Sequence, residues 1–469
     1  MKTTTGWLLA VSAALSFTSL ADNETRQLYL ENCASCHGDN YGGGMAPSML
    51  DDEWVNGGSV KAIASSIRHG IESRGMPAWE AKLSESQIQN LAKLLHSAGQ
   101  QQSDPQVTKP EAGFHSDYHS FDLQQVLSTD GVIWAFDFLP GGSLIFTERN
   151  GDLMLFEQDR MNRIAGTPEV WHFKQGGLLD VKVDPEYTDN GWIYLSYSQK
   201  TGKNDNGTDV GSLVVIRGRI QDGQWVDQQR LWAPPEAKHI NRGWHFGSRF
   251  AIDGDYLFFS NGDEGYRDRA QDIDIQNGKI HRIYKDGRVP EDNPFVGNPD
   301  GMDSIWSYGH RNPQGMTFTP DGQTLWATEH GPKGGDELNR IQKGGNYGWP
   351  KATFGINYDG TPITEHTSLP GMVDPVHHWT PSIAAAGINF YTGSAFPRWQ
   401  GDLFVSSLAM QELHRIRLKD NEVLEDEVVL KDEGRIRDVA TAPDGTLFIA
   451  INDNENGVHR IMRLHPAGD

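Results

Sequence analysis

The sequence predicts an all-β six-bladed β-propeller preceded by a small all-α domain. Apolar residues recur at helical spacing as far as residue 99, whereas short strand-like runs alternate with Gly- and Asp-rich turns through the rest of the chain. The composition agrees, because 52 glycines and 14 tryptophans in 469 residues are typical of turn-rich β domains. We therefore divide the chain into a signal peptide (1–21), the helical domain (22–99), a linker (100–117) and the propeller (118–469).

Residues 1–21 have the pattern of a signal peptide. Lys2 precedes an apolar run over residues 7–15, and residues 19–21 (Ser-Leu-Ala) follow as a small-residue cleavage site. The run is shorter than the roughly 20 residues that cross a bilayer, and no later stretch is apolar enough to do so. We therefore expect export to the periplasm, with secretion as the alternative, and no membrane span.

The two cysteines of the chain both lie in the motif Cys33-Ala34-Ser35-Cys36-His37. C-x-x-C-H is the attachment sequence of c-type haem, in which the thiols bond to the porphyrin and the histidine binds the iron. A thioredoxin-like redox pair would need a βαβ pattern, and a zinc site would need a second pair of ligands; the sequence offers neither. The motif therefore predicts covalent haem c, held by Cys33, Cys36 and His37.

The helices expected around this motif are typical of a class I cytochrome c domain. Residues 24–34 and 60–69 have helical apolar spacing, and Ser84 with Gln87 forms a capping box that opens a last helix. The apolar face of that helix consists of Ile88, Leu91, Leu94 and Leu95.

Such a domain needs a sixth iron ligand, and Met76 is the candidate. It lies 39 residues after His37, in a Gly/Pro loop before the last helix. A thioether ligand raises the haem potential, which suits an electron acceptor. Met45, Met49 and His69 are the alternatives.

After the linker, the strand-like runs recur about every 45–75 residues, a spacing that suits one four-stranded blade with long loops. A pair of β-sandwiches is the alternative, but it does not explain the recurring unit. The runs lie at residues 144–147, 192–195, 256–259, 324–327, 402–405 and 446–449.

Several segments of the propeller hold more charged and polar residues than a plain β-scaffold needs. Loops at one end of a propeller channel converge, so distant residues can line one pocket. The segments are residues 245–249, 261–265, 308–315, 329–339, 344–350 and 434–438. At these segments, and at 175–180 and 379–382, the chain resembles the soluble quinoprotein glucose/sorbosone dehydrogenases, which use pyrroloquinoline quinone (PQQ) and have a six-bladed propeller; the likeness runs from Phe121 to Leu464.

Oxidation of an alcohol or lactol carbon by hydride loss needs a base, and His245 is the candidate. Asp263 can orient its imidazole and stabilise the imidazolium. No side chain can accept a hydride, so the acceptor must be a cofactor. His245 also matches the base of the family.

PQQ carries three carboxylates, so its pocket should be rich in cations and hydrogen-bond donors. Arg311, Arg435 and Arg437 supply bidentate donors, while Gln175 and Asn312 supply neutral hydrogen bonds. All five positions match the family's cofactor contacts.

The resemblance also implies calcium. A hard cation polarises a quinone oxygen toward hydride acceptance. The family holds this ion through backbone carbonyls, which map to Gly331 and Pro332, and a second, structural calcium maps to Glu337 and Tyr347.

The chain departs from the family at Ala409, where a lysine commonly contacts the quinone. The loss of one hydrogen bond to a charged group weakens binding by about 1.5–3 kcal/mol. Lys333 is a candidate to compensate.

The formal net charge of −22 argues against nucleic acid or an anionic membrane as a partner, and fits a neutral substrate or a basic redox partner. The sequence thus predicts a periplasmic PQQ- and calcium-dependent aldose dehydrogenase that passes electrons to its haem and on to an external cytochrome or respiratory acceptor. The alternatives are a calcium-dependent propeller lactonase and a non-catalytic glycan-binding propeller fused to a cytochrome.

Overall fold

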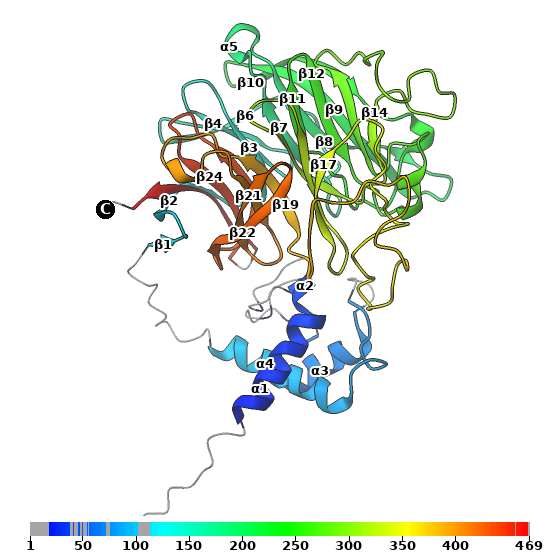
Figure 1. The fold of residues 1–469 in the computed structure, drawn as a ribbon, viewed down its shortest axis with the longest axis vertical. Helices are drawn as coiled ribbons and strands as arrows, with labels where there is room; N and C mark the ends of the chain where they lie inside the picture. The colour runs from blue at the N-terminus through cyan, green and yellow to red at the C-terminus, as the bar shows by residue number, and fades with distance from the viewer. Residues whose placement is uncertain are drawn as a thin grey trace, which may run out of the picture.

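The computed structural model describes residues 18–37, 41, 46, 49, 54, 56–71, 76–101, 113–454 and 456–467. These residues form the predicted helical domain and six-bladed β-propeller (Figure 1). Residues 1–17 of the predicted signal peptide, most of the predicted linker and Met45 lie outside the described residues. No helix in the described part of the chain is long and apolar enough to cross a membrane.

In the described residues, the N-terminal domain has four α-helices. They are α1 (Thr18–Asn32), α2 (Ala34–His37), α3 (Val60–His69) and α4 (Glu85–Gln101). Helix α1 begins inside the segment predicted to be the signal peptide, and α1 and α3 both pack on α4. The predicted capping box is confirmed, since Ser84 N–H donates to Gln87 Oε1 (2.9 Å) and Gln87 N–H donates to Ser84 Oγ (3.3 Å).

Each blade is an antiparallel sheet, and the strands follow one another in chain order. The first three blades contain β3 (Ile133–Phe138), β4 (Leu144–Glu148), β5 (Leu153–Glu157) and β6 (Arg160–Ile164); β7 (Leu178–Val183), β8 (Ile193–Lys203), β9 (Asp209–Gln221) and β10 (Gln224–Trp232); and β11 (Phe250–Asp253), β12 (Tyr256–Asn261), β13 (Lys279–Tyr284) and β14 (Ile305–Tyr308). The next two contain β15 (Pro313–Phe318), β16 (Leu325–Glu329), β17 (Asp336–Ile341) and β18 (His377–Trp379); and β19 (Ala385–Phe390), β20 (Leu403–Ser407), β21 (Glu412–Lys419) and β22 (Glu422–Lys431).

The last blade joins the two ends of the propeller. It contains β23 (Arg435–Thr441), β24 (Leu447–Asp453), β25 (Val458–Pro466), β2 (Ser120–Thr129) and β1 (Phe114–His115). Strand β2 comes from the start of the propeller and pairs with β25 from its end, in a register that places Phe121 opposite Pro466. Because both termini of the propeller share one sheet, the ring is closed by backbone hydrogen bonds. Short helices lie between strands: α5 (Tyr187–Asn190), η2 (Glu236–Lys238), η3 (Arg267–Gln271) and η4 (Pro397–Trp399).

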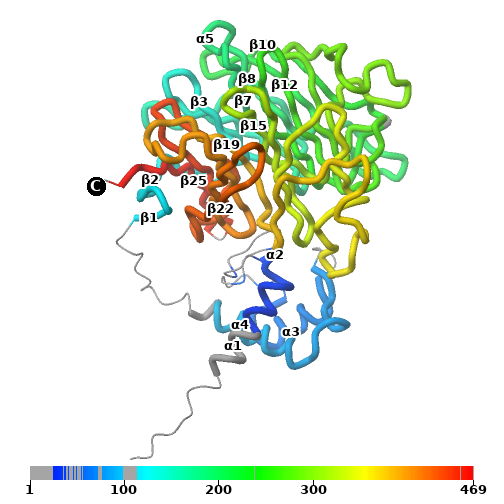
Figure 2. Tube along the Cα trace, in the orientation of Figure 1, coloured from blue at the N-terminus to red at the C-terminus, as the bar shows by residue number. Residues whose placement is uncertain are grey.

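Every strand-like run that the sequence predicts overlaps the second strand of a blade: β4, β8, β12, β16, β20 and β24. The first strands form the inner ring, because β3, β7, β11, β15, β19 and β23 each pack against the next around the channel. The helical domain lies beneath the propeller in Figures 1 and 2, with α2 at the end nearest to the propeller.

Candidate active site

One cavity of about 1310 Å³ is lined by residues of both domains. On the propeller side, the predicted residues reach it from the beginnings of inner strands. Gln175 precedes β7, His245 precedes β11, Arg311 precedes β15, and Arg437 lies near the start of β23. Since the inner strands are neighbours around the channel, residues more than 250 positions apart in the chain meet at one end of it.

The predicted catalytic pair is assembled. His245 Nδ1 lies 2.7 Å from Asp263 Oδ1, and the fully buried Asp263 also accepts hydrogen bonds from Gly265 N (2.7 Å) and Trp349 Nε1 (2.8 Å). With Nδ1–H donated to Asp263, the other ring nitrogen, Nε2, is the acceptor 3.3 Å from Arg311 Nη2. Burial and the Arg311 charge lower the pKa of His245 below its usual value, although Asp263 opposes this. The imidazole is therefore neutral at pH 7, as a general base must be.

Backbone and side-chain contacts fix the position of His245. Its backbone N–H donates to Gln175 Oε1 (2.7 Å), and its φ of 49° lies in the left-handed region. Two residues further along the loop, Gly247 donates its N–H to Asn312 Oδ1 (3.1 Å). The side-chain carbonyl oxygens of Gln175 and Asn312 thus hold the loop that carries His245. Their side-chain amide nitrogens can donate hydrogen bonds to a cofactor.

Seven arginines line the cavity, and four of them matter here: the predicted Arg311, Arg435 and Arg437, and Arg149, which the sequence did not single out. Among the described residues, none of the four has a carboxylate within ion-pair distance. Burial, with repulsion from Arg149, lowers the pKa of Arg435 to about 10, and the pKa of Arg437 is lowered by burial and by Arg435. Arg149 Nε and Arg437 Nε are buried without a hydrogen-bond partner.

Uncompensated, partly unsatisfied cations cost free energy in an empty site and bind a polyanion favourably. A ligand with several carboxylates fits this group of arginines. By contrast, the buried Arg249, which precedes the third blade, is compensated by Asp180 (3.1 Å) of the second blade and Asp438 (2.9 Å) of the last blade.

The loop predicted to hold calcium is anchored by the buried Asp336. Its carboxylate accepts hydrogen bonds from Gly331 N (2.7 Å), Ser382 Oγ (2.7 Å) and Ala385 N (3.0 Å). The carbonyl oxygens of Gly331 and Pro332 accept no hydrogen bond from any described residue. Two such carbonyls on a fixed loop suit a hard cation.

The second predicted calcium position contains two buried carboxylates. Asn339 Nδ2 donates to Glu329 and to Glu337 (3.0 Å each), and burial together with Glu329 raises the pKa of Glu337 well above its usual value. A cation would relieve that repulsion. The Tyr347 hydroxyl is already used, since it donates to Arg340 O (2.6 Å) and accepts from Gln342 N (2.8 Å), so any ligand from Tyr347 would be its backbone carbonyl.

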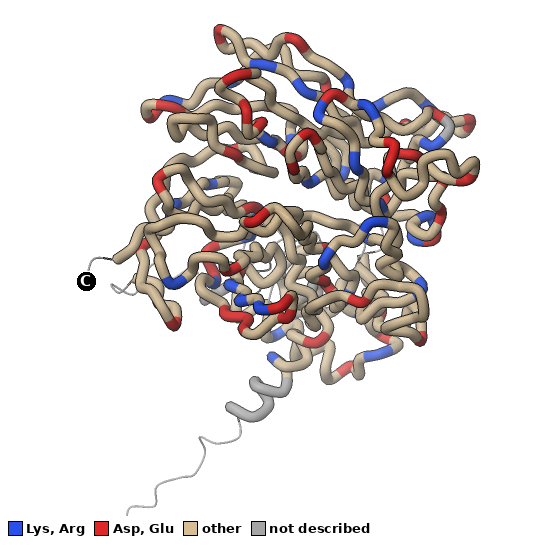
Figure 3. The backbone as a smooth tube through the Cα atoms, turned by 45° about the horizontal axis from the view of Figure 1, so that its top comes forward, with Lys and Arg blue, Asp and Glu red and all other residues tan. Residues whose placement is uncertain are grey.

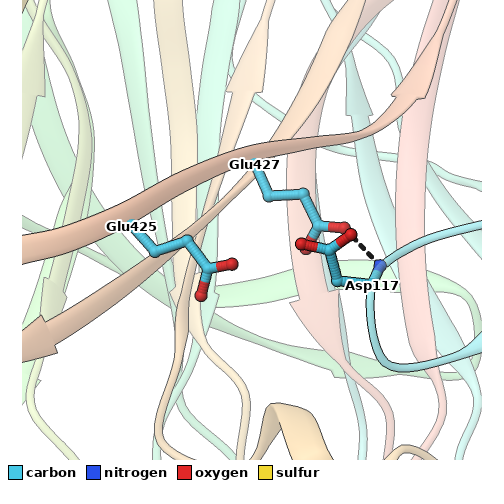
Figure 4. A group of neighbouring side chains, drawn as sticks. All are labelled: Asp117, Glu425 and Glu427. Atoms are coloured by element: carbon cyan, nitrogen blue, oxygen red, sulfur yellow. Dashed lines mark hydrogen bonds between the residues drawn. The ribbon is translucent and has the colours of Figure 1, made fainter.

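A third acidic group is found on the blade edge. Asp117, Glu425 and Glu427 bring ligand atoms within reach of one ion (Figure 4). The buried Arg415 already binds Glu425 (3.0 Å) and Glu427 (2.6 Å), and Asp117 N–H donates to Glu427 (2.6 Å). The group is therefore an ion-pair network, and none of its three carboxylates lines the cavity.

The helical domain contributes the opposite wall of the cavity. Cys33, Cys36, His37 and Met76 all line it, together with apolar side chains such as Leu91. The two cysteines are not joined in a disulfide, and burial raises the pKa of the Cys33 thiol to about 12.

Two of the alternative iron ligands are described. Met49 also lines the cavity, whereas the ring of His69 bonds to Ser65 on another surface of the domain. The structure thus brings His37 and Met76 to one chamber, as the haem prediction requires.

Sequence reasoning missed several cavity residues. Trp244 is 41% exposed and directly precedes His245, a position that could have identified it. Arg149 and Tyr358 lie in loops without a motif, so no pattern marks them.

Ala409 is buried among Ala384, Ala386 and Leu408. Lys333 does not line the cavity, and its ammonium lies near the helical domain. Arg149 lines the cavity and is close enough to Arg435 and Arg437 to repel them, so it is an additional cation beside the predicted pair.

Comparisons with known proteins agree with this geometry. Residues 131–463 match the family model described as glucose/sorbosone dehydrogenase, and residues 21–95 match that of cytochrome c oxidase, cbb3-type, subunit III. The aldose sugar dehydrogenase YliI of Escherichia coli (strain K12) is 40% identical over 342 residues, which cover 71% of this chain and 90% of that protein.

Solved structures give the same result. A crystal structure of glucose dehydrogenase superposes with a TM-score of 0.69 at 36% identity, over 74% of this chain and 99% of the other. The PQQ-bound form of aldose sugar dehydrogenase from Streptomyces coelicolor gives a TM-score of 0.60 at 25% identity, over 74% and 98%. The chain therefore belongs to the glucose/sorbosone dehydrogenase family and carries an N-terminal cytochrome c domain.

Proposed function

We propose that this protein is a periplasmic PQQ- and calcium-dependent aldose dehydrogenase that passes electrons to its own c-type haem and on to an external acceptor. The observation that carries the proposal is the shared cavity. The His245–Asp263 pair, the unpaired arginines and the haem motif all line it. The PQQ-bound relative supports the choice of cofactor.

Each cofactor has residues suited to hold it. Arg149, Arg311, Arg435 and Arg437 would bind the PQQ carboxylates, and the motif at residues 33–37 would bind the haem. The carbonyls of residues 331–332, which accept no hydrogen bond from a described residue, would bind Ca²⁺. When bound, PQQ accepts the hydride, Ca²⁺ polarises the accepting carbonyl, and the haem accepts electrons one at a time.

The protein's own contribution is to place a base and a binding surface for the sugar. His245 Nε2 takes the proton of the sugar hydroxyl, and Asp263 stabilises the imidazolium that forms. Trp244 offers an exposed apolar face beside His245, on which the C–H face of a sugar ring can pack.

The test is a stopped-flow haem spectrum after an aldose is mixed with protein that carries haem, PQQ and Ca²⁺. We expect haem reduction only when both PQQ and sugar are present. His245→Asn should slow it by about 10²–10⁴-fold, the usual contribution of a general base. If the loaded protein neither oxidises an aldose nor reduces its haem, the proposal is wrong.

The same experiment separates the two alternatives. A lactonase needs carboxylates that converge on a channel metal, and the described residues place no such three-carboxylate group in the cavity. Lactone hydrolysis without any change in the haem spectrum would nevertheless favour it. If the propeller only binds a glycan, sugar should bind without being oxidised. The redox activity of the cytochrome domain should then be unaffected by His245→Asn.

A further inference from the structure

Two segments of the fourth blade contact the cytochrome domain. We call residues 331–333 and 356–360 the docking segments. They lie between β16 and β17 and between β17 and β18, and they pair with each other. Lys333 N–H donates to Ile356 O (3.1 Å), and Ile356 N–H donates to Lys333 O (3.2 Å).

The side chain of Lys333 extends from the first docking segment to the cytochrome domain. Its Nζ lies 3.4 Å from Asn32 Oδ1 and 5.5 Å from the centre of the Trp79 ring. Asn32 is the residue before Cys33, and Trp79 is three residues after Met76. A single ammonium therefore touches the chain next to both segments that are expected to bind the haem iron.

Within the propeller, Lys333 lies next to the proposed calcium site. It directly follows Gly331 and Pro332, the backbone positions proposed to hold Ca²⁺ next to the quinone. It is half-buried, and no described carboxylate lies within ion-pair distance of it. Through one side chain, Lys333 thus links the loop proposed to hold Ca²⁺ with the two segments expected to bind the haem iron.

The second docking segment reinforces the contact. Tyr358 lines the shared cavity, and its phenol interacts with Arg311 on the propeller side. A Cβ added to Gly360 would lie 3.2 Å from Lys82 Nζ, so the backbone there is packed closely on the cytochrome domain.

We propose that Lys333 is a positioning residue for internal electron transfer. It docks the part of the cytochrome domain around Asn32 and Trp79 on the propeller loop that contains residues 331–333. The inference rests on the proposed function. Interfaces between domains of one chain resemble transient protein contacts, so a single partly buried cation can decide how much of the protein is docked. Electron transfer slows steeply with distance, and undocked molecules contribute little to it.

The test compares Lys333→Met with Lys351→Met in the full-length protein carrying haem, PQQ and Ca²⁺. Lys351 lies in the β17–β18 loop of the same blade and is exposed, so it is a matched control. We expect Lys333→Met to slow sugar-driven haem reduction by up to about fivefold, the largest effect that the loss of about 1 kcal/mol of docking free energy can have. Lys351→Met should leave it unchanged, and Lys333→Arg should restore most of it.

Two further measurements make the result specific. Sugar oxidation with an artificial dye, which takes electrons directly from the quinone, should be the same in all variants. Small-angle X-ray scattering of the PQQ-free protein should show a larger maximum dimension for Lys333→Met only.

Each contrary outcome has a distinct meaning. Unchanged haem reduction and unchanged dimensions in Lys333→Met would overturn the docking role, and an equal loss of dye activity would move Lys333 into sugar oxidation instead. If the unmodified protein reduces no haem, the proposed function fails, while the scattering comparison still decides whether Lys333 docks the domains.

Discussion

At the scale of single residues, the environment of His245 determines how activity should depend on pH. Burial and Arg311 lower its pKa below the usual value near 6.5, and the base works only when neutral. Dye-linked kcat/KM should therefore stay constant as the pH falls through 6.5 and decline only at lower pH. A decline centred above 6.5 would contradict the assignment of His245 as the base.

Replacement of Asp263, the hydrogen-bond partner of His245, tests the same pair. Asp263 raises the pKa of His245, so Asp263→Asn should move the acidic limb to still lower pH. It should also reduce kcat by about 10²–10⁴-fold, because the orientation of the imidazole and the stabilisation of its cation are both lost. Tyr187→Phe, on a distant surface helix, is the control and should leave the profile unchanged.

The unpaired arginines predict opposite effects on the empty and the loaded protein. Arg437→Gln removes a buried cation that Arg435 and Arg149 repel, so the melting temperature without PQQ should stay the same or rise. It also removes a charge-assisted contact to a carboxylate, so the Kd for PQQ should rise about tenfold to hundredfold. Calorimetric titration and thermal melts with and without PQQ measure both quantities, with the exposed Arg163→Gln as control. Unchanged PQQ affinity in Arg437→Gln would contradict the proposed role.

The sequence was informative about individual residues only where chemistry leaves a motif. The haem motif and the His245 segment could be recognised because their residue types and spacing match the chemistry proposed for them. Arg149 and Tyr358 reach the cavity only through the arrangement of the blades, which no local pattern reveals. The sequence could not determine the direction of the Lys333 side chain for the same reason.

At the scale of elements, the second strand of each blade was predictable and the first was not. Second strands such as β8 and β12 have neighbours on both sides, and their buried apolar runs follow turns rich in Gly and Asp. The inner strands begin with site residues instead, as at Arg435 in β23, so function interrupts the apolar pattern there.

Packing of the closing strand β2 should contribute substantially to the free energy of unfolding of the propeller. Phe121 is fully buried, and its ring lies 5.6 Å from Phe114, 6.2 Å from Phe396 and 5.8 Å from Trp399, centre to centre. Phe121→Ala should reduce the free energy of unfolding by about 3–5 kcal/mol.

Gln124→Ala, at an exposed position of the same strand, is the control for Phe121 and should change the free energy of unfolding by less than about 0.5 kcal/mol. Urea denaturation followed by tryptophan fluorescence measures both. Equal effects of the two substitutions would show that closure of the ring does not depend on this contact.

At the scale of the whole molecule, the charge of the protein predicts how it delivers electrons to its partner. The formal net charge is −22, and acidic residues are spread over the surface loops of the propeller (Figure 3). A basic cytochrome would be steered toward such a surface, and salt screens this attraction because the Debye length shortens from about 30 Å at 0.01 M to about 8 Å at 0.15 M.

Salt should therefore slow the second electron transfer and not the first. The bimolecular rate constant for reduction of a basic external cytochrome should fall about tenfold or more between these two salt concentrations. The proposed sugar-driven reduction of the internal haem would take place within one molecule, across the cavity that both domains line, and should change little. Stopped-flow measurements at two wavelengths follow both steps in one mixture. If the external step is insensitive to salt or accelerates with it, the partner is not a basic protein, and the acidic surface serves another purpose.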